Sequence, residues 1–179
     1  INYSCTTEDK EISSDAIELQ IGDRIPSFNI TMNDGKTISD KDLIGQESVI
    51  VFFHTGCKDC QKELPIIQRY YENHPYTPVI CIIRAQVKNS IATYWQANQL
   101  TLPYSAQESR NIFELFAYHT IPRIYIIDAE GIIRNIFTDN PLATYGDLVE
   151  AIQNPNKKTS SIHCLQYKKR ITFANDGKI

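Results

Sequence analysis

The sequence lacks the features that define several broad classes of protein. In its 179 residues, no apolar run approaches the ~20 residues needed to cross a lipid bilayer. The net charge of -3 provides no bulk attraction to nucleic acid, and the basic residues at 157–158 and 168–170 are more typical of a solvated tail. No internal repeat or low-complexity segment is present. Because 42% of the residues are apolar and 22% are charged, we expect one ordinary globular domain.

The five cysteines are an odd number, so at least one of them is unpaired or modified. A second C-x-x-C motif is missing, which argues against a structural zinc site. Gln61, and not a histidine, follows the motif that is present, which argues against covalent attachment of haem. Cys81 lies inside an apolar run and is predicted to be a small buried side chain. Bridges from Cys164 to Cys5 or to Cys81 stay open, because a sequence does not reveal connectivity.

The most informative stretch runs from Val49 to Pro65. Its first five residues are apolar and rich in β-formers, which is typical of a central strand covered on both faces. A short polar turn follows, and then the pair Cys57 and Cys60. From Cys60 onward, apolar residues recur at helical spacing, which predicts a helix with one face on the sheet. The stretch therefore predicts a buried strand that delivers two thiols to the start of a helix.

The two cysteines have the spacing of a redox-active pair. Residues three apart on a helix lie on neighbouring turns, so a disulfide between them can form and open with little backbone movement. At the first turn, free backbone N–H groups and the helix dipole favour Cys57 as a thiolate. We therefore predict that Cys57 attacks a disulfide and that Cys60 resolves the mixed disulfide. A purely structural bridge would close only a few residues and would constrain the unfolded chain little.

Strands and helices alternate along the rest of the chain. Apolar and polar residues alternate before a turn at 33–36, which predicts an N-terminal β-hairpin. The later pattern predicts strands at 78–84, 123–127 and 132–137 and helices at 90–98, 110–119 and 142–153. We therefore expect an α/β domain over residues 21–156, with a central mixed β-sheet flanked by helices. Residues 1–20 are predicted to form a flexible tether and residues 157–179 a C-terminal tail.

The motifs of this chain, in their order along the sequence, resemble those of a family of thioredoxin-fold proteins. This is the group of extracytoplasmic thiol-disulfide oxidoreductases known as the redoxin or TlpA/ResA-like family. The resemblance covers about residues 21–153. It rests on a Gly-x-x-apolar-Pro-x-Phe opening at Gly22–Phe28 and a hairpin turn at Asp34–Lys36. It rests further on a C-x-x-C-x-x-E-x-P motif at Cys57–Pro65 and an Ile-Pro pair before a strand at Ile121–Asp128. It implies a thioredoxin-like fold with an N-terminal β-hairpin extension and a thiol-disulfide oxidoreductase activity.

The resemblance also implies how the site works. Cys57 would be the nucleophile, Cys60 the resolving cysteine and Pro122 a cis-proline that faces both. The backbone of Ile121 would pair with an extended substrate strand. Glu63 matches an acid that the family carries three residues after the second cysteine, and a partly buried carboxylate there would exchange a proton with the Cys60 thiol.

Thr55 and Gly56, next to the nucleophile, are the other predicted substrate contacts. Gly56 stands where the family commonly has a tryptophan, which predicts a more open approach to Cys57. Val51 stands where thioredoxin has a buried aspartate, so that proton route is absent. The resemblance implies protein disulfides as substrates, a membrane electron donor, and no metal or dissociable cofactor. Reduction is favoured over oxidation as the direction of the reaction.

Cys5 resembles the lipid-bearing cysteine at the mature start of a bacterial lipoprotein. It follows Ser4 and precedes a polar, acidic stretch, although Asn2 stands where an aliphatic residue is usual. We therefore expect an extracytoplasmic protein, either periplasmic or anchored in the membrane through lipidated Cys5. The alternative is a plain unstructured N-terminus.

Two other functions remain open. A peroxiredoxin-like peroxidase shares the N-terminal hairpin, but its usual Thr-x-x-Cys is not met, because Thr55 is two residues before Cys57. A non-enzymatic thioredoxin-fold lipoprotein would bind a partner or carry a soft metal through His54, Cys57 and Cys60. Three ligands without a visible fourth make a poor zinc site.

Overall fold

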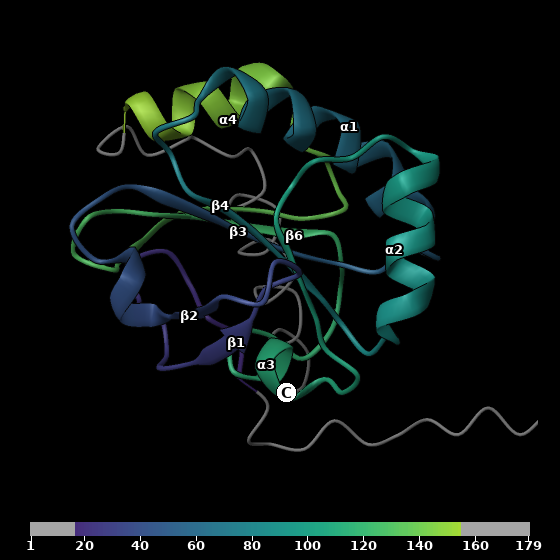
Figure 1. Ribbon diagram of the computed structural model, residues 1–179. Coiled ribbons are helices and arrows are strands. Elements are labelled where there is room, and N and C mark those ends of the chain that lie inside the picture. Colours follow the sequence, from purple (N-terminus) through teal and green to yellow (C-terminus); the bar gives the residue numbers. More distant parts are fainter. Residues whose placement is uncertain (1–16, 155–179) are drawn as a thin grey trace, which may run out of the picture.

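The computed structural model describes residues 17–154 of the chain (Figure 1). Cys5 with its predicted lipid, Cys164, residues 1–16 of the predicted tether and all of the predicted tail lie outside the described residues. Between residues 17 and 154, no helix is both long enough and apolar enough to cross a bilayer.

A mixed sheet of five strands forms the centre of the domain, in the order β5-β4-β3-β6-β7. The central strand β3 runs parallel to β4 and antiparallel to β6, while β5 continues parallel and β7 antiparallel at the two edges. The bounds of the strands are β3 Ser48–Phe53, β4 Val79–Ile83, β5 Tyr104–Ala106, β6 Arg123–Ile127 and β7 Ile133–Phe137.

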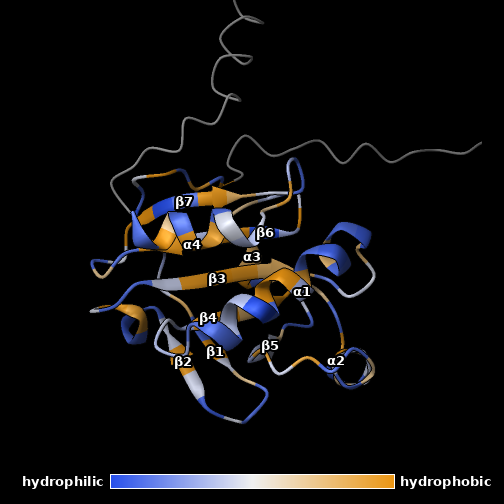
Figure 2. Ribbon diagram, turned by 90° about the horizontal axis from the view of Figure 1, so that it is seen from above, coloured by the Kyte–Doolittle hydropathy of each residue, from blue (hydrophilic) through white to orange (hydrophobic). Residues whose placement is uncertain are grey.

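Helices cover both faces of this sheet (Figures 1 and 2). One face carries α1 (Lys58–Asn73), α2 (Lys88–Ala97) and α4 (Tyr145–Gln153), and α1 contacts α4. The other face carries the short helix α3 (Asn111–Glu114) and the N-terminal hairpin. The hairpin consists of β1 (Asn29–Thr31) and β2 (Thr37–Ser39), and the 3-10 turn η1 (Asp40–Leu43) follows it.

The side chains of the three inner strands point alternately to two hydrophobic cores. In β3, Val49, Val51 and Phe53 pack under α1 and α2, whereas Ile50 and Phe52 pack toward α3 and the hairpin. The strands β4 and β6 alternate in the same way. This period of two explains the unbroken apolar run that the sequence shows there, because both faces of the sheet are covered. Figure 2 shows β3 as a largely apolar strand beneath α1 and α4.

Two helices are shorter than the sequence predicted. The helix expected at 110–119 ends at Glu114, where the backbone N–H groups of Leu115 and Phe116 donate to carbonyls three residues earlier instead of four, so the α-helical pattern gives way to a turn. The helix expected from residue 142 begins at Tyr145. There Thr144 caps the N-terminus: its hydroxyl accepts from the backbone N–H of Asp147, whose carboxylate accepts from Thr144 in return.

Strand register brings distant segments to one edge of the sheet. Phe52 lies opposite Arg123 and Phe53 lies opposite Ile83. The residues that follow β3, those that precede β6 and those that follow β4 therefore all emerge at the same edge. Cys57 is four residues beyond β3, and Pro122 immediately precedes β6, so the fold itself places the predicted nucleophile beside the predicted proline.

Candidate active site

Cys57 occupies the N-cap position of α1. Its backbone is extended, and its sulfur accepts a hydrogen bond from the backbone N–H of Cys60 at 3.2 Å. The Cys57 thiol also donates to the carbonyl oxygen of Ile121 at 3.6 Å. A sulfur in this position lies at the positive end of the helix, where N–H groups and the macrodipole stabilise negative charge. The side chain remains partly exposed.

Cys60 lies one turn further along α1 and is fully buried. Burial raises the pKa of the Cys60 thiol well above its usual value, and the neighbouring Cys57 sulfur adds to that rise. Both cysteines are free thiols, as is the buried Cys81 in β4. Of the pair, only Cys57 is partly exposed, so the geometry favours Cys57 as the attacking group and Cys60 as the group that acts second.

Two glutamines hold the turn before Cys57, and the sequence did not reveal either of them as part of the site. The side chain of Gln86 accepts from the backbone N–H of Thr55 at 3.1 Å and donates to the Thr55 hydroxyl. Gln61 donates to the carbonyl oxygen of Thr55 at 2.7 Å. Thr55 is buried, and these contacts engage all its polar groups. Gly56, next to it, is exposed.

His54 folds back over this turn. Its Nδ1 accepts a hydrogen bond from the backbone N–H of Gly56 at 2.9 Å. A side chain at Gly56 would meet the imidazole ring, since a Cβ there would lie 3.2 Å from Nδ1. Burial, and then the nearby Arg84, lowers the pKa of His54. The histidine is therefore a neutral acceptor that shapes the turn.

Arg84 directly follows β4 and places a positive charge near the dithiol. Its guanidinium lies 5.0 Å above the ring of Phe113, and a thiolate at Cys57 or Cys60 would attract it. Burial, with repulsion from Arg110, lowers the pKa of Arg84. Within residues 17–154 it has no carboxylate as an ion-pair partner. The sequence held one indication of this position, since it places a charged residue at the end of the strand predicted at 78–84. Because β4 runs parallel to β3, that residue emerges at the same edge of the sheet as Cys57.

The segment of residues 116–122, here called the proline loop, forms the opposite wall. The bond between Ile121 and Pro122 is cis. Thr120 has a φ of 53°, a left-handed conformation that side chains disfavour. Pro122 is buried, whereas Ile121 is partly exposed, with its carbonyl oxygen facing Cys57.

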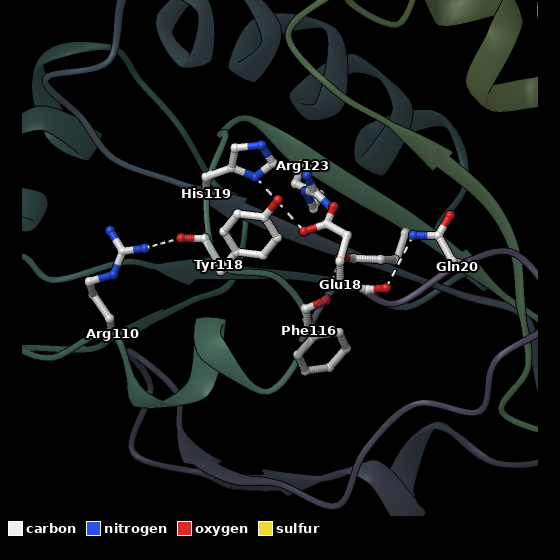
Figure 3. A network of polar contacts seen from close by, with 8 residues as sticks. Glu18, Gln20, Arg110, Phe116, Tyr118, His119 and Arg123 are labelled. Carbon is white, nitrogen blue, oxygen red and sulfur yellow. Dashed lines mark hydrogen bonds and ion pairs between the residues drawn. The ribbon is translucent and has the colours of Figure 1, made fainter. Parts of the chain in front are cut away.

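Polar contacts fix the proline loop from outside the site (Figure 3). Arg110 donates to the carbonyl oxygen of Tyr118. Glu18 forms an ion pair with Arg123, the residue that follows Pro122, and lies 3.8 Å from Nδ1 of His119. Glu18 falls within the span predicted as a tether, so ordered contacts with the domain begin before residue 21.

Glu63 lies on α1, one turn beyond Cys60, and is only 1% exposed. Burial raises the pKa of Glu63 to about 7; the backbone N–H of Ala143 opposes this rise, and the carboxylate of Asp147 adds to it. Neither carboxylate oxygen has a hydrogen bond of normal geometry to another described residue. A buried carboxyl of this kind exchanges its proton near neutral pH.

The structure thus brings together Cys57, Cys60, Ile121 and Pro122, with Gly56 exposed beside them. Thr55 lies beneath the turn, where its polar groups bond to glutamines. His54 does not complete a metal site with the cysteines: among residues 17–154, no group of three or more His, Cys, Asp or Glu side chains is placed to hold a metal ion.

Comparisons with known proteins show which family the sequence resembles. The family model described as AhpC/TSA matches residues 21–136. A thiol-disulfide oxidoreductase ResA of Bacillus thuringiensis is 30% identical over 120 residues, which are 66% of this chain and 69% of that protein.

Solved structures show the same architecture. The crystal structure of StoA from Bacillus subtilis has a TM-score of 0.62 at 24% identity and covers 70% of this chain and 96% of that one. The exposed lipoprotein thioredoxin Etrx1 of Streptococcus pneumoniae has a TM-score of 0.64 at 17% identity and covers 72% and 99% of the two chains. These similarities confirm the predicted thioredoxin-like α/β fold, with its mixed sheet and N-terminal hairpin.

Replacing Arg84 tests its action on the nucleophile. We expect Arg84→Met to slow alkylation of Cys57 by iodoacetamide at pH 7 by about threefold to tenfold, because the thiolate loses a nearby, partly screened positive charge. Arg84→Lys should restore part of the rate. Arg69→Met is the matched control, because Arg69 lies on α1 but twelve residues beyond Cys57. In this variant, iodoacetamide should alkylate Cys57 at the wild-type rate. An unchanged rate in Arg84→Met would contradict the assignment.

The raised pKa of Glu63 predicts a pH-dependent stability. The folded protein binds this proton more tightly than the unfolded chain does, so its free energy of unfolding should fall as pH rises from the ordinary glutamate pKa of 4.5 to about 7 and then level off. Glu63→Gln should lack this decline. Its free energy of unfolding relative to that of the wild type should therefore increase by up to about 3 kcal/mol across that pH range. Urea unfolding at several pH values measures the difference. Glu72→Gln, exposed on the same helix, should instead follow the wild type.

Proposed function

Because the chain belongs to the AhpC/TSA family, and within it to the ResA-type thiol-disulfide oxidoreductases, we propose that it reduces protein disulfides outside the cytoplasm. The observation that carries this proposal is the asymmetry of the dithiol. Cys57 is partly exposed at the helix N-terminus, whereas Cys60 is buried one turn behind it. Such a pair can attack an outside disulfide and then close on itself.

The reaction proceeds in two exchanges. The Cys57 thiolate attacks one sulfur of a substrate disulfide, the substrate S–S bond breaks, and the released sulfur leaves as a thiolate that takes up a proton. Cys60 then loses its proton and attacks the Cys57 sulfur of the mixed disulfide. The second substrate sulfur leaves, and Cys57 and Cys60 remain as a disulfide. Two electrons have passed from the protein to the substrate, and a dithiol donor must supply them again.

Glu63 serves the second exchange as the proton acceptor for Cys60. The Cys60 thiol is buried and its pKa is raised, so it needs a base before it can attack. A carboxyl whose pKa is about 7 is available as a carboxylate in a large fraction of molecules at neutral pH. Its position one helical turn from Cys60 supports this role.

The substrate approaches over Gly56 and along the proline loop. The missing side chain at Gly56 leaves the turn open beside the nucleophile. The partly exposed Ile121 offers its backbone to an extended polypeptide, while Pro122 presents no N–H group to the sulfurs. Thr55 is buried, so it contributes by keeping the turn in place and does not contact the substrate itself.

The cellular setting is proposed from the chain and its relatives together. Lipidated Cys5 would anchor the protein to a bacterial membrane on the extracytoplasmic side, and a membrane protein would return electrons to the dithiol. A relative in fold, Etrx1, is named an exposed lipoprotein, which supports this placement. Neither a metal nor a dissociable cofactor is needed for the exchange.

The peroxidase alternative has less support, although the family description covers AhpC as well. Thr55 lies two residues before Cys57, and its hydroxyl is engaged by Gln86. It is therefore not free to orient a peroxide beside the sulfur. A metal carrier is disfavoured because Nδ1 of His54 already accepts from Gly56.

The two cysteines should have separable roles. We expect Cys57→Ser to abolish reduction of insulin disulfides, because no accessible thiol remains at the site. Cys60→Ser should instead accumulate a mixed disulfide between Cys57 and the substrate, visible by non-reducing electrophoresis and mass spectrometry. Cys81→Ser, a buried thiol outside the pair, is the control for loss of a cysteine. Retained insulin reduction in a folded Cys57→Ser protein would rule out this function.

The reduction potential of the pair tests the direction. We expect a value near or below that of thioredoxin, about -270 mV, as suits a reductase. Thiol trapping and mass spectrometry in glutathione and dithiothreitol buffers give the value. A potential near that of DsbA, about -120 mV, would make the protein an oxidant or isomerase instead.

A further inference from the structure

A nearly buried ion pair lies at the base of the proline loop. The Arg123 side chain is 4% exposed and pairs with Glu18, whose side chain is 27% exposed. Arg123 is the first residue of β6 and directly follows Pro122. The pair therefore connects the first described residues of the chain to the residue next to the predicted substrate-binding proline (Figure 3).

Glu18 is the carboxylate on which this guanidinium depends. Burying a charged group is unfavourable unless a partner compensates it. In the described part of the chain, Glu18 is the only acidic residue that forms a salt bridge with Arg123, and Nε of Arg123 has no hydrogen-bond partner. Removing the carboxylate would leave a buried positive charge, which would draw Arg123 and the backbone before it toward solvent.

The same short segment holds the loop at two further points. The backbone N–H of Leu19 donates to the carbonyl oxygen of Phe116 at 2.9 Å. Glu18 also faces His119, with 3.8 Å between its Oε2 and the ring Nδ1. Residues 18 and 19 thus contact the first residue of the loop, a middle residue and the residue after its end.

We infer that Glu18 is a positioning residue for polypeptide substrates. It pairs with Arg123, and through this contact it keeps the backbone of Ile121 in place beside Cys57. The Cys57 sulfur lies 3.6 Å from the Ile121 carbonyl oxygen. This inference rests on the proposed function. An extended polypeptide needs both the sulfur and the Ile121 backbone, whereas a small disulfide needs the sulfur alone, so Glu18 acts selectively on the larger substrate.

Glu18→Gln in the full chain tests the inference, with dithiothreitol as the electron donor. We expect KM for insulin to rise by roughly tenfold, as for a lost binding contact, while kcat/KM for hydroxyethyl disulfide stays within about twofold of the wild type. Glu18→Asp, which keeps the charge on a shorter side chain, should give an intermediate KM. Asp34→Asn, which removes an exposed ion pair with Lys36 in the hairpin turn, is the control and should change neither value.

Hydrogen exchange separates this inference from the proposed function, because it needs no turnover. Amides of residues 116–123 should exchange faster in Glu18→Gln than in the wild type, while those of β3 and β4 stay protected. Unchanged exchange there, or an equal loss of activity on both substrates, would overturn the positioning role. A wild type that reduces neither disulfide would count against the proposed function instead. If Glu18→Gln does not fold, Glu18→Asp carries the same measurements.

Discussion

The antiparallel register of β3 and β6 is the constraint on which the site depends. It sets Arg123 opposite Phe52, so the chain leaves β3 toward Cys57 and enters β6 from Pro122 at one edge of the sheet. The parallel register of β4 brings Arg84 to the same edge. A shift of one residue would turn every apolar side chain of β3 to the opposite core. The two packed cores therefore fix the distance between the sulfur and the proline loop.

The two sulfurs differ because their surroundings differ, although they lie three residues apart. Cys57 has a helix N-terminus, a backbone N–H and a nearby guanidinium, all of which favour negative charge. Cys60 has burial and an adjacent sulfur, which disfavour it. The nearby Glu63 shares this burial and holds its proton to near neutral pH. The proposed division of labour between the thiols rests on these differences in solvation and charge.

The parts of the site that are local in sequence could be predicted, and the parts made by tertiary contacts could not. A C-x-x-C after a buried strand defines Cys57 and Cys60, and Pro122 could be placed by resemblance to a family motif. No sequence motif marks Gln86, because it lies in the loop after β4 and contacts Thr55, which is 31 residues earlier in the chain. The pairing of Glu18 with Arg123 joins residues 105 positions apart. The start of α4 was also missed, because the side chains of Thr144 and Asp147 cap the backbone there.

Two residues that border the dithiol have left-handed backbones. Ala85 follows Arg84 and has a φ of 55°, and Thr120 precedes Ile121 with a φ of 53°. Each such conformation costs an L-residue roughly 1–2 kcal/mol. The domain is therefore less stable than its two cores alone would make it, and the deficit lies in the segments on either side of Cys57. Packing elsewhere keeps the reactive edge in a shape that these segments would not adopt by themselves.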